Sequence, residues 1–295
     1  MVKSDSKRPS LAGLSALAVA VGAALSGCHW ANPAERAAAP IAEKNADARG
    51  GLAAWRAVQS MSMSGQLEAG TPRDQAKLAL SMLKPTRELR AEARGALAKG
   101  READAPRPVR LPFVLELARP RKTRLEIRFQ GQTAVQVFDG AAGWKLRPFL
   151  GRREVEPFSP DELRLASEQA DLDGPLIDAA SKGGRVELEG TEPVEGRDAY
   201  RLKVTSSAGK VRHVWVDTRT FLDVKVDGTR RMDGKLRTTW TLLRDYRTVA
   251  GVKVPFLLET TVEGVAGSEK IQVEHVTLNP QLDAARFARP APDQS

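Results

Sequence analysis

The stretch LPFVLELARPRKTRLEIRFQGQTAVQVFDG, residues 111–140, decides the fold of this chain. Apolar residues recur in it at every second position over several short runs, which is typical of β-strands that bury one face. The alternating residues are Leu111, Phe113, Leu115, Leu117, Leu125, Ile127, Phe129, Val135 and Val137. Because one side of each run is apolar and the other is mixed, the stretch predicts consecutive antiparallel strands with one buried face.

The same alternation recurs along the rest of the chain, from residues 61–67 to residues 271–273. It predicts about ten or eleven strands in all, with Asp-Gly pairs that favour tight hairpins between several of them. The pairs are Asp139-Gly140, Asp227-Gly228 and Asp233-Gly234. No regular alternation of strand and helix is present, so a Rossmann-type fold is excluded.

Two helical segments interrupt the strands. An early helix is broken at Gly50-Gly51 and followed by Trp55, and residues 160–180 fit one or two short helices. A long antiparallel sheet tends to curl, and its apolar concave side must be covered. The sequence therefore predicts a mainly β protein, whose curled antiparallel sheet forms a half-open barrel capped by the helices.

The N-terminus has the features of a bacterial export signal. Basic residues precede an apolar run over residues 11–25, and that run is too short to span a bilayer. It ends in Leu25-Ser26-Gly27-Cys28, which resembles the lipobox of bacterial lipoproteins. The resemblance implies cleavage before Cys28 and acylation of this residue, the only cysteine in the chain. Since His29 stands where an aspartate favours retention in the inner membrane, an outer-membrane anchor facing the periplasm is expected.

The predicted organisation has four parts. Residues 1–27 form the signal peptide, 28–44 a lipidated tether, 45–285 one half-barrel domain, and 286–295 a C-terminal tail. Within the domain, residues 70–110 are a loop or an insertion whose structure the pattern leaves open, because strand and helix signals both occur in it.

Residues suited to catalysis are sparse. The three histidines, His29, His213 and His275, lack metal-ligand spacing, and no phosphate-binding glycine loop or nucleophile elbow is present. Asp171 and Asp173 precede Gly174-Pro175, which favours a turn over a calcium fragment. We therefore expect no enzymatic activity, no cofactor and no metal site.

The formal net charge of +9 leaves two interpretations open. An exported protein meets little nucleic acid, so anionic lipid head groups are better partners for the excess charge, unless it is only a mixed-charge surface. The basic turn around Arg119, Arg121, Lys122 and Arg124 has the same two interpretations, a head-group clamp or solvated charges.

Several motifs resemble the outer-membrane lipoprotein-sorting protein family, the LolA/LolB-like superfamily. They are Gly50-Gly51 with Trp55, Phe138-Asp139-Gly140 with Trp144, the stretch 194–200 (VEGRDAY), the stretch 214–217 (VWVD) with Thr220, and Tyr246 with the stretch 251–255 (GVKVP). The resemblance covers residues 45–280 and implies a half-barrel capped by helices, with an apolar cavity for acyl chains.

Two functions follow from these expectations. In the first, an outer-membrane-anchored lipoprotein binds a lipid or a lipoprotein acyl chain in its cavity, with a role in lipid or lipoprotein sorting. In the second, the core is filled, and the protein is an envelope scaffold or stress sensor that binds a protein partner. The predicted ligand-lining residues are Phe113, Leu115, Leu125, Ile127, Phe129, Val135, Val137, Trp144, Leu176, Ile177, Trp215, Trp240, Phe256 and Leu258.

Overall fold

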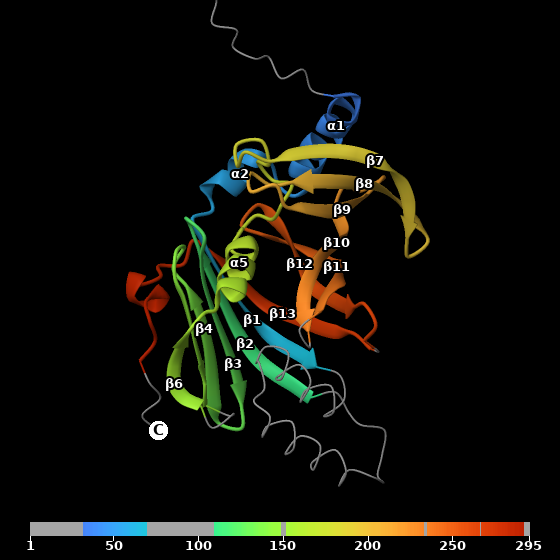
Figure 1. Ribbon diagram of the computed structural model, residues 1–295. Helices are drawn as coiled ribbons and strands as arrows, with labels where there is room; N and C mark the ends of the chain where they lie inside the picture. Colours follow the sequence, from blue (N-terminus) through green and yellow to red (C-terminus); the bar gives the residue numbers. More distant parts are fainter. Residues whose placement is uncertain (1–31, 70–108, 149–151, 233–234, 266, 292–295) are drawn as a thin grey trace, which may run out of the picture. The chain divides into compact units, whose positions relative to one another are not determined.

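The computed structural model describes residues 32–69, 109–148, 152–232, 235–265 and 267–291. Within these ranges, three α-helices accompany thirteen strands that form one antiparallel sheet (Figure 1). The helices are α1 (Pro33–Ala48), α2 (Leu52–Ala57) and α5 (Pro160–Gln169), and a short 3-10 helix, η2 (Ala284–Phe287), lies near the C-terminus. The prediction of a half-open, mainly β sheet with a few helices is confirmed.

The strands follow one another with few interruptions. They are β1 (Ser60–Ala69), β2 (Val109–Ala118), β3 (Lys122–Phe129), β4 (Gln132–Phe138), β5 (Gly143–Arg147), β6 (Arg152–Pro157), β7 (Arg185–Val194), β8 (Arg197–Thr205), β9 (Val211–Asp217), β10 (Asp223–Met232), β11 (Lys235–Val249), β12 (Val252–Val262) and β13 (Glu269–Leu278).

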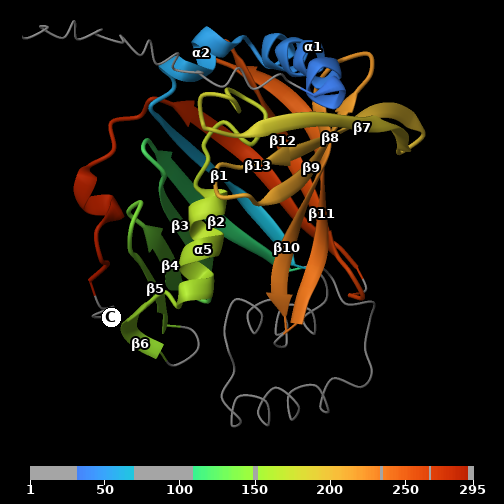
Figure 2. The same ribbon diagram turned by 45° about the horizontal axis from the view of Figure 1, so that its top comes forward.

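The order across the sheet is β6-β5-β4-β3-β2-β1-β13-β12-β11-β10-β9-β8-β7. The chain therefore enters at β1 inside the sheet, runs outward by hairpins to the edge strand β6, and resumes with β7 at the opposite edge. From β7 it returns by hairpins to β13, which pairs with β1. Residues 158–184, which we call the crossing segment, must pass from one edge to the other over one face of the sheet (Figure 2).

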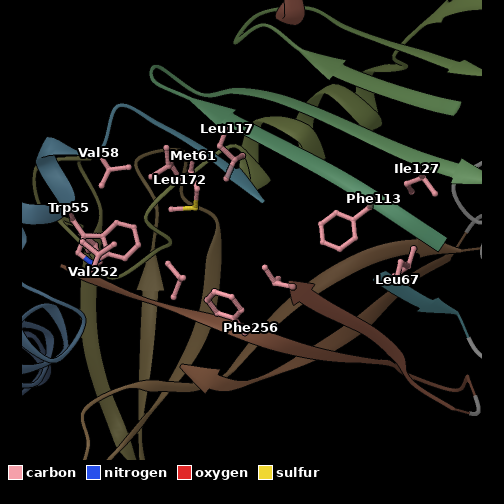
Figure 3. Packing of buried hydrophobic residues seen from close by; sticks show 13 residues of the cluster. Trp55, Val58, Met61, Leu67, Phe113, Leu117, Ile127, Leu172, Val252 and Phe256 are labelled. Atoms are coloured by element: carbon pink, nitrogen blue, oxygen red, sulfur yellow. The ribbon is translucent and has the colours of Figure 1, made fainter. Parts of the chain in front are cut away.

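The face beneath the crossing segment carries the main core and is called the inner face. Alternate residues of the central strands point to it, among them Phe113, Leu117, Val254 and Phe256, and they pack with Trp55 of α2 (Figure 3). Leu172 and Ile177 of the crossing segment belong to the same cluster. The helices and the crossing segment therefore cap the inner face, as the sequence predicts.

Helix α1 begins earlier than the sequence analysis expects. Asn32 accepts a hydrogen bond from the amide of Glu35, whose side chain returns to the amide of Asn32, and Pro33 occupies the first turn. This capping box starts a helix in the alanine-rich segment that was assigned to the tether. The helix stops before Gly50, whose φ of 112° and close approach to the backbone of Gly251 leave no room for a side chain.

Two further local predictions are wrong. Asp227-Gly228 does not form a hairpin turn but lies within β10, where the Asp227 carboxylate accepts from the backbone amide of His213 and pairs with its ring. The highly charged strand β6 was missed, because Val155 is its only buried residue. Asp139-Gly140 does form a turn, between β4 and β5. Asp233-Gly234, Cys28 and residues 70–108 lie outside the described ranges.

The opposite, outer face of β2–β5 is covered by the C-terminal segment. Phe287 of η2 is 3% exposed and packs with Val135, Val137 and Leu146. Arg286 donates to Glu116 at 2.6 Å and to Glu126 at 3.2 Å, although the sequence analysis assigned it to the tail. Among the described residues, no helix combines the length and apolar character needed to span a membrane.

Replacing Phe287 should show how strongly this cover stabilises the sheet. Phe287→Ala is expected to lower the free energy of unfolding by about 3 kcal/mol, because it removes a buried aromatic ring and leaves a cavity. Urea unfolding measures the change. The control Val211→Ala, at a position 44% exposed, should change stability by less than about 0.5 kcal/mol. Equal effects of the two substitutions would contradict a packed C-terminal cover.

Candidate functional site: the inner face of the half-barrel

The centre of the inner face is an apolar wall that is only partly covered. Met63, Leu115 and Leu125 stand opposite one another on β1, β2 and β3, and Leu258 stands opposite Ile271 on β12 and β13. All five side chains are half-buried and pack against the main core. Met63 lies opposite Val276 and Leu67 lies opposite Ile271, so the two groups are separated by four positions along β1. Both groups line the same face and keep partial access to solvent.

Nine of the fourteen predicted lining residues lie on this side of the sheet. They are Phe113, Leu115, Leu125, Ile127, Phe129, Phe256 and Leu258 on strands, with Leu176 and Ile177 in the crossing segment. Phe129 shares the face of Ile127 near the end of β3 and is half-buried. Contact with a ligand remains a prediction for all of them.

The other five predicted residues lie on the outer face, in two separate clusters. Val135, Val137 and Trp144 pack beneath the C-terminal segment. Trp215 and Trp240 belong to an outer cluster on β7–β11, where the Lys225 ammonium lies 4.1 Å from the Trp215 ring centre. Sequence periodicity could not separate these residues from the inner set, because covers on both sides make both faces apolar.

The inner face of β8–β10 is packed by α1. Ala38 and Ile41 of the helix contact Leu202, Val214 and Val216, which are at most 1% exposed. This half of the barrel is therefore filled, and the half-buried wall lies toward β1–β3, β12 and β13. The lining residues are divided between a packed half and a partly open half.

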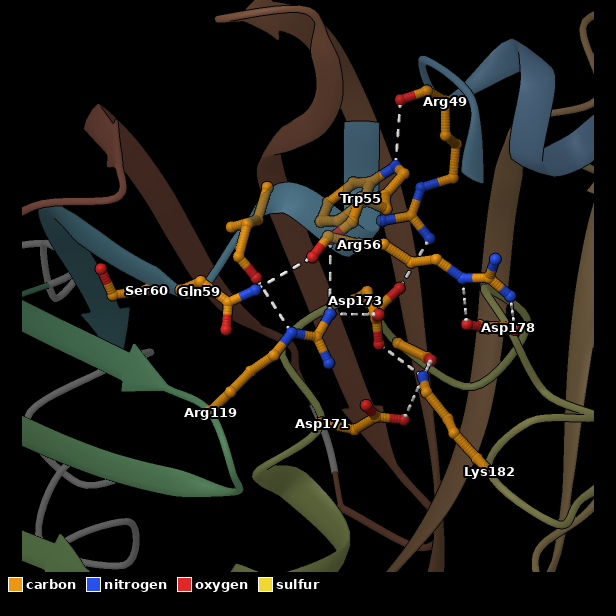
Figure 4. A network of polar contacts seen from close by, with 12 residues as sticks. Arg49, Trp55, Arg56, Gln59, Ser60, Arg119, Asp171, Asp173, Asp178 and Lys182 are labelled. Carbon is orange, nitrogen blue, oxygen red and sulfur yellow. Dashed lines mark hydrogen bonds and ion pairs between the residues drawn. The ribbon is translucent and has the colours of Figure 1, made fainter. Parts of the chain in front are cut away.

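A polar network fastens the crossing segment above this core (Figure 4). Arg119, at the end of β2, donates to Asp173 at 2.6 Å and to the carbonyl of Val58 at 2.9 Å. Lys182 donates to Asp171 at 2.9 Å, pairs with Asp173, and reaches the carbonyl of Gly174 at 2.8 Å. Lys182 binds Asp171 and Asp173 at the other end of residues 171–182, so the network closes these residues into a compact turn, and Arg119 fastens that turn to the end of β2.

Arg49 connects the same turn to the helices. Its guanidinium donates to the carbonyl of Asp173 at 3.0 Å and to the carboxylate of Asp223 at 3.3 Å. The Trp55 indole donates to the carbonyl of Arg49 at 3.1 Å and stacks under its guanidinium at 4.5 Å. Asn45 of α1 completes the contact by donating to Asp223 at 2.8 Å. The junction of α1 and α2 is thereby joined to the crossing segment and to β10.

The two carboxyl groups of the turn have opposite electrostatic properties. Burial raises the pKa of Asp171 to about 6, despite the attraction of Lys182. Burial also disfavours ionisation of Asp173, but hydrogen bonds with Asp171, Lys182 and Arg119 hold the pKa of Asp173 below its ordinary value. Asp173 is therefore the permanent anion of the network, and Asp171 titrates close to neutral pH.

The sequence analysis identified a turn at Asp171 and Asp173 but did not find their cationic partners. Arg119 is distant from the two aspartates in the sequence, and Lys182 is separated from them by the turn. Neither residue belongs to a recognisable motif. The only signal for these cations was a pair of carboxylates among apolar residues, because a buried negative charge requires a positively charged or hydrogen-bonding partner. In the described ranges, no cluster of three or more histidine, cysteine or acidic residues is placed to bind a metal ion.

Solved structures with this fold come from several bacteria. A DUF1329 family protein from Desulfovibrio piger aligns with a TM-score of 0.53 and 13% identity, over 87% of this chain and 98% of that one. A domain assigned to outer-membrane lipoprotein sorting, from Vibrio parahaemolyticus, aligns with a TM-score of 0.50 and 11% identity, over 86% and 97%. A LolA superfamily protein from Nitrosomonas europaea gives 0.48 and 12%, over 84% and 96%.

The first two likenesses show that the chain shares the fold of the DUF1329 family protein and of the lipoprotein-sorting domain, in agreement with the fold that the sequence motifs implied. No protein-family model matches the sequence, and no curated protein matches it either. At such low identity, the shared feature is the fold alone.

The titration of Asp171 gives a pH-dependent prediction. Because the folded state raises the pKa of Asp171 to about 6, ionising this group costs stability as the pH rises from about 4 to about 7. Asp171→Asn removes that cost, so its stability relative to wild type should increase over this range. The expected gain is about 1 kcal/mol, since a side chain that is 34% exposed is partly screened by water.

Thermal unfolding of both proteins across this pH range measures the difference. Asp198→Asn, a change of an exposed carboxylate on β8, is the matched control. A difference between Asp171→Asn and wild type that does not vary with pH would contradict the buried position of Asp171.

Proposed function

Taking the LolA-like fold as the premise, we propose that this protein is a lipid-anchored protein of the bacterial envelope that binds an acyl chain on its inner face. The solved Vibrio domain with the same fold is assigned to outer-membrane lipoprotein sorting, which supports this class of role. The ligand is a lipid or the acyl chain of a lipoprotein, and the proposal includes no catalytic step.

The observation that carries the proposal is the half-buried wall of the inner face. Met63, Leu115 and Leu125 form one half-buried apolar group, Leu258 and Ile271 form a second, and both pack against the same core cluster. Each methylene group buried there contributes about 0.8 kcal/mol, so a chain of about ten methylenes outweighs a typical association cost. An acyl chain is the simplest ligand whose shape and chemistry match such a surface.

The proposed anchor is the acylated Cys28. A single acyl chain holds a protein on a membrane only marginally, whereas two or more hold it stably, and the lipobox resemblance implies several. With His29 following the cysteine, we place the anchor in the outer membrane, with the domain facing the periplasm.

A filled scaffold that binds an envelope protein is the second candidate. It is favoured by the packing of α1 on β8–β10, where Leu202, Val214 and Val216 have almost no exposed surface. If the partly open wall were closed in the same way, no acyl chain would fit. The two candidates therefore differ in whether Leu258 and its neighbours meet a ligand.

Leu258→Trp distinguishes the candidates. On an open wall, the indole should occupy the ligand's place, reduce fluorescent fatty-acid binding at least about fivefold, and leave the unfolding temperature nearly unchanged. In a filled core, the larger ring should destabilise the protein by about 1–3 kcal/mol, with no fatty-acid binding by either protein. The control Leu236→Trp, at a position 59% exposed, should change neither quantity.

Cys28→Ala tests the anchor separately. The variant should move from the membrane fraction to the soluble periplasmic fraction, because the acyl chains that hold the protein would be missing. Immunoblotting of fractionated cells measures the distribution, with Ser26→Ala as the control substitution beside the cleavage site. Unchanged membrane association of Cys28→Ala would contradict lipidation as the tether.

A further inference from the structure

The sheet splits between β10 and β11. Their ladder runs from Met232 opposite Lys235 to Lys225 opposite Leu242 and ends there. Beyond this point Asp245 of β11 has a left-handed φ of 53°, and β10 begins at Asp223. A cavity of about 260 Å³ lies at the split, a size suited to a molecule smaller than a typical drug-sized ligand.

Three segments that are distant in sequence meet at this cavity. They are the β7–β8 turn with Glu195 and Arg197, the β9–β10 turn with Asp217 and Thr220, and the end of β11 with Tyr246. Each of them carries one of the sequence motifs noted above. The acyl-chain function uses none of these residues, because they lie away from the half-buried inner wall.

The cavity combines an apolar lining with charged groups. Val194, Leu222, Val224 and Leu243 supply the apolar part. Val194 and Val224 also pack in the outer cluster that contains Trp215, whereas Leu243 stands opposite Leu258 of the inner wall. A ligand here would bury an apolar group among these side chains.

Most of the lining charges are already paired within the protein. Arg244 pairs with Glu195 and donates to Glu259 at 2.6 Å. Asp245 accepts from Arg247 at 2.6 Å and 3.2 Å. Each of these charges therefore already has an opposite partner within the protein.

Arg197 and Asp217 are the exceptions. Within the described residues, the exposed guanidinium of Arg197 has no hydrogen bond and no ion pair. Asp217 is 3% exposed, and its Oδ1 accepts from the amides of Arg219 and Thr220 and from the Thr220 hydroxyl, at 3.0, 2.8 and 3.1 Å. Its Oδ2 accepts no hydrogen bond from the described chain.

Asp217 carries its charge at neutral pH. Burial disfavours ionisation, but the hydrogen bonds from Thr220 and Arg219, together with the attraction of the Arg197 charge, outweigh it and lower the pKa of the carboxyl group. The cavity thus presents one cation and one carboxylate oxygen that have no hydrogen-bond partner among the described residues, with an apolar lining beside them. A buried anion with a free oxygen is a strong acceptor for an ammonium group.

We propose that this cavity binds a small zwitterion with an apolar side chain, of the α-amino acid class. The ligand carboxylate contacts the Arg197 guanidinium, whose planar donors suit it, and the ligand ammonium contacts Asp217 Oδ2. The side chain packs on Leu222, Val224 and Leu243. Because the unpaired charges of the cavity are one of each sign, a ligand with a single charge satisfies only half of the site.

Calorimetric titration of the full chain with L-leucine tests the proposal, with isovalerate and isopentylamine as the singly charged analogues. L-leucine should bind saturably, and each analogue at least about tenfold more weakly, since each loses one charge-assisted contact. Arg197→Gln should weaken L-leucine binding at least about tenfold, and Arg197→Lys should restore part of it.

The matched control is Arg219→Gln, which changes an exposed arginine of the neighbouring turn that does not line the cavity. It should alter binding by less than about twofold. No binding of L-leucine up to about 10 mM, equal losses in Arg197→Gln and Arg219→Gln, or isovalerate binding as tightly as L-leucine would each overturn the proposal. Circular dichroism confirms that each variant is folded.

Discussion

The passage of the chain from one edge of the sheet to the other is the constraint on which the structure depends. Because β1 and β13 are neighbours inside the sheet, the edge strands are β6 and β7. The chain between β6 and β7 must therefore cross a whole face of the sheet. The crossing covers apolar residues that would otherwise meet water. Asp173, held by Arg119 and Lys182 and by Arg49 through its carbonyl, secures the crossing segment to β2 and to the helices.

This arrangement divides the inner face into two parts with different capacities. Helix α1 fills the part over β8–β10, where side chains from both sides interdigitate and no surface remains. Helix α5 has no buried residue and is attached by side-chain contacts instead, with Glu162 bound to Lys145 and Glu168 paired with Lys210. Helix α5 is therefore attached to the sheet mainly through its charges, whereas α1 is attached through a packed apolar face.

Prediction from sequence succeeded where one periodicity dominated and failed where local and tertiary signals disagreed. Leu111–Leu117 and Leu125–Phe129 alternate strictly, and both lie on strands with those residues on the inner face. Asp227-Gly228 has the composition of a turn, but β11 pairs with both residues, and the Asp227 carboxylate accepts from the amide of His213 on β9. Val137 and Trp144 have the strand pattern of the inner set, yet the C-terminal segment covers them on the other face.

The sequence by itself determined the fold class of this protein, an antiparallel sheet with helical caps, because the alternation of apolar residues is a local property. Only the tertiary structure decided which apolar residues share a face and which charges meet. Arg119 and Asp173 are brought together by the path of the crossing segment, and Arg197 and Asp217 by the pairing of β8 with β9. Register depends on pairing across the whole sheet, and no short stretch of sequence encodes it.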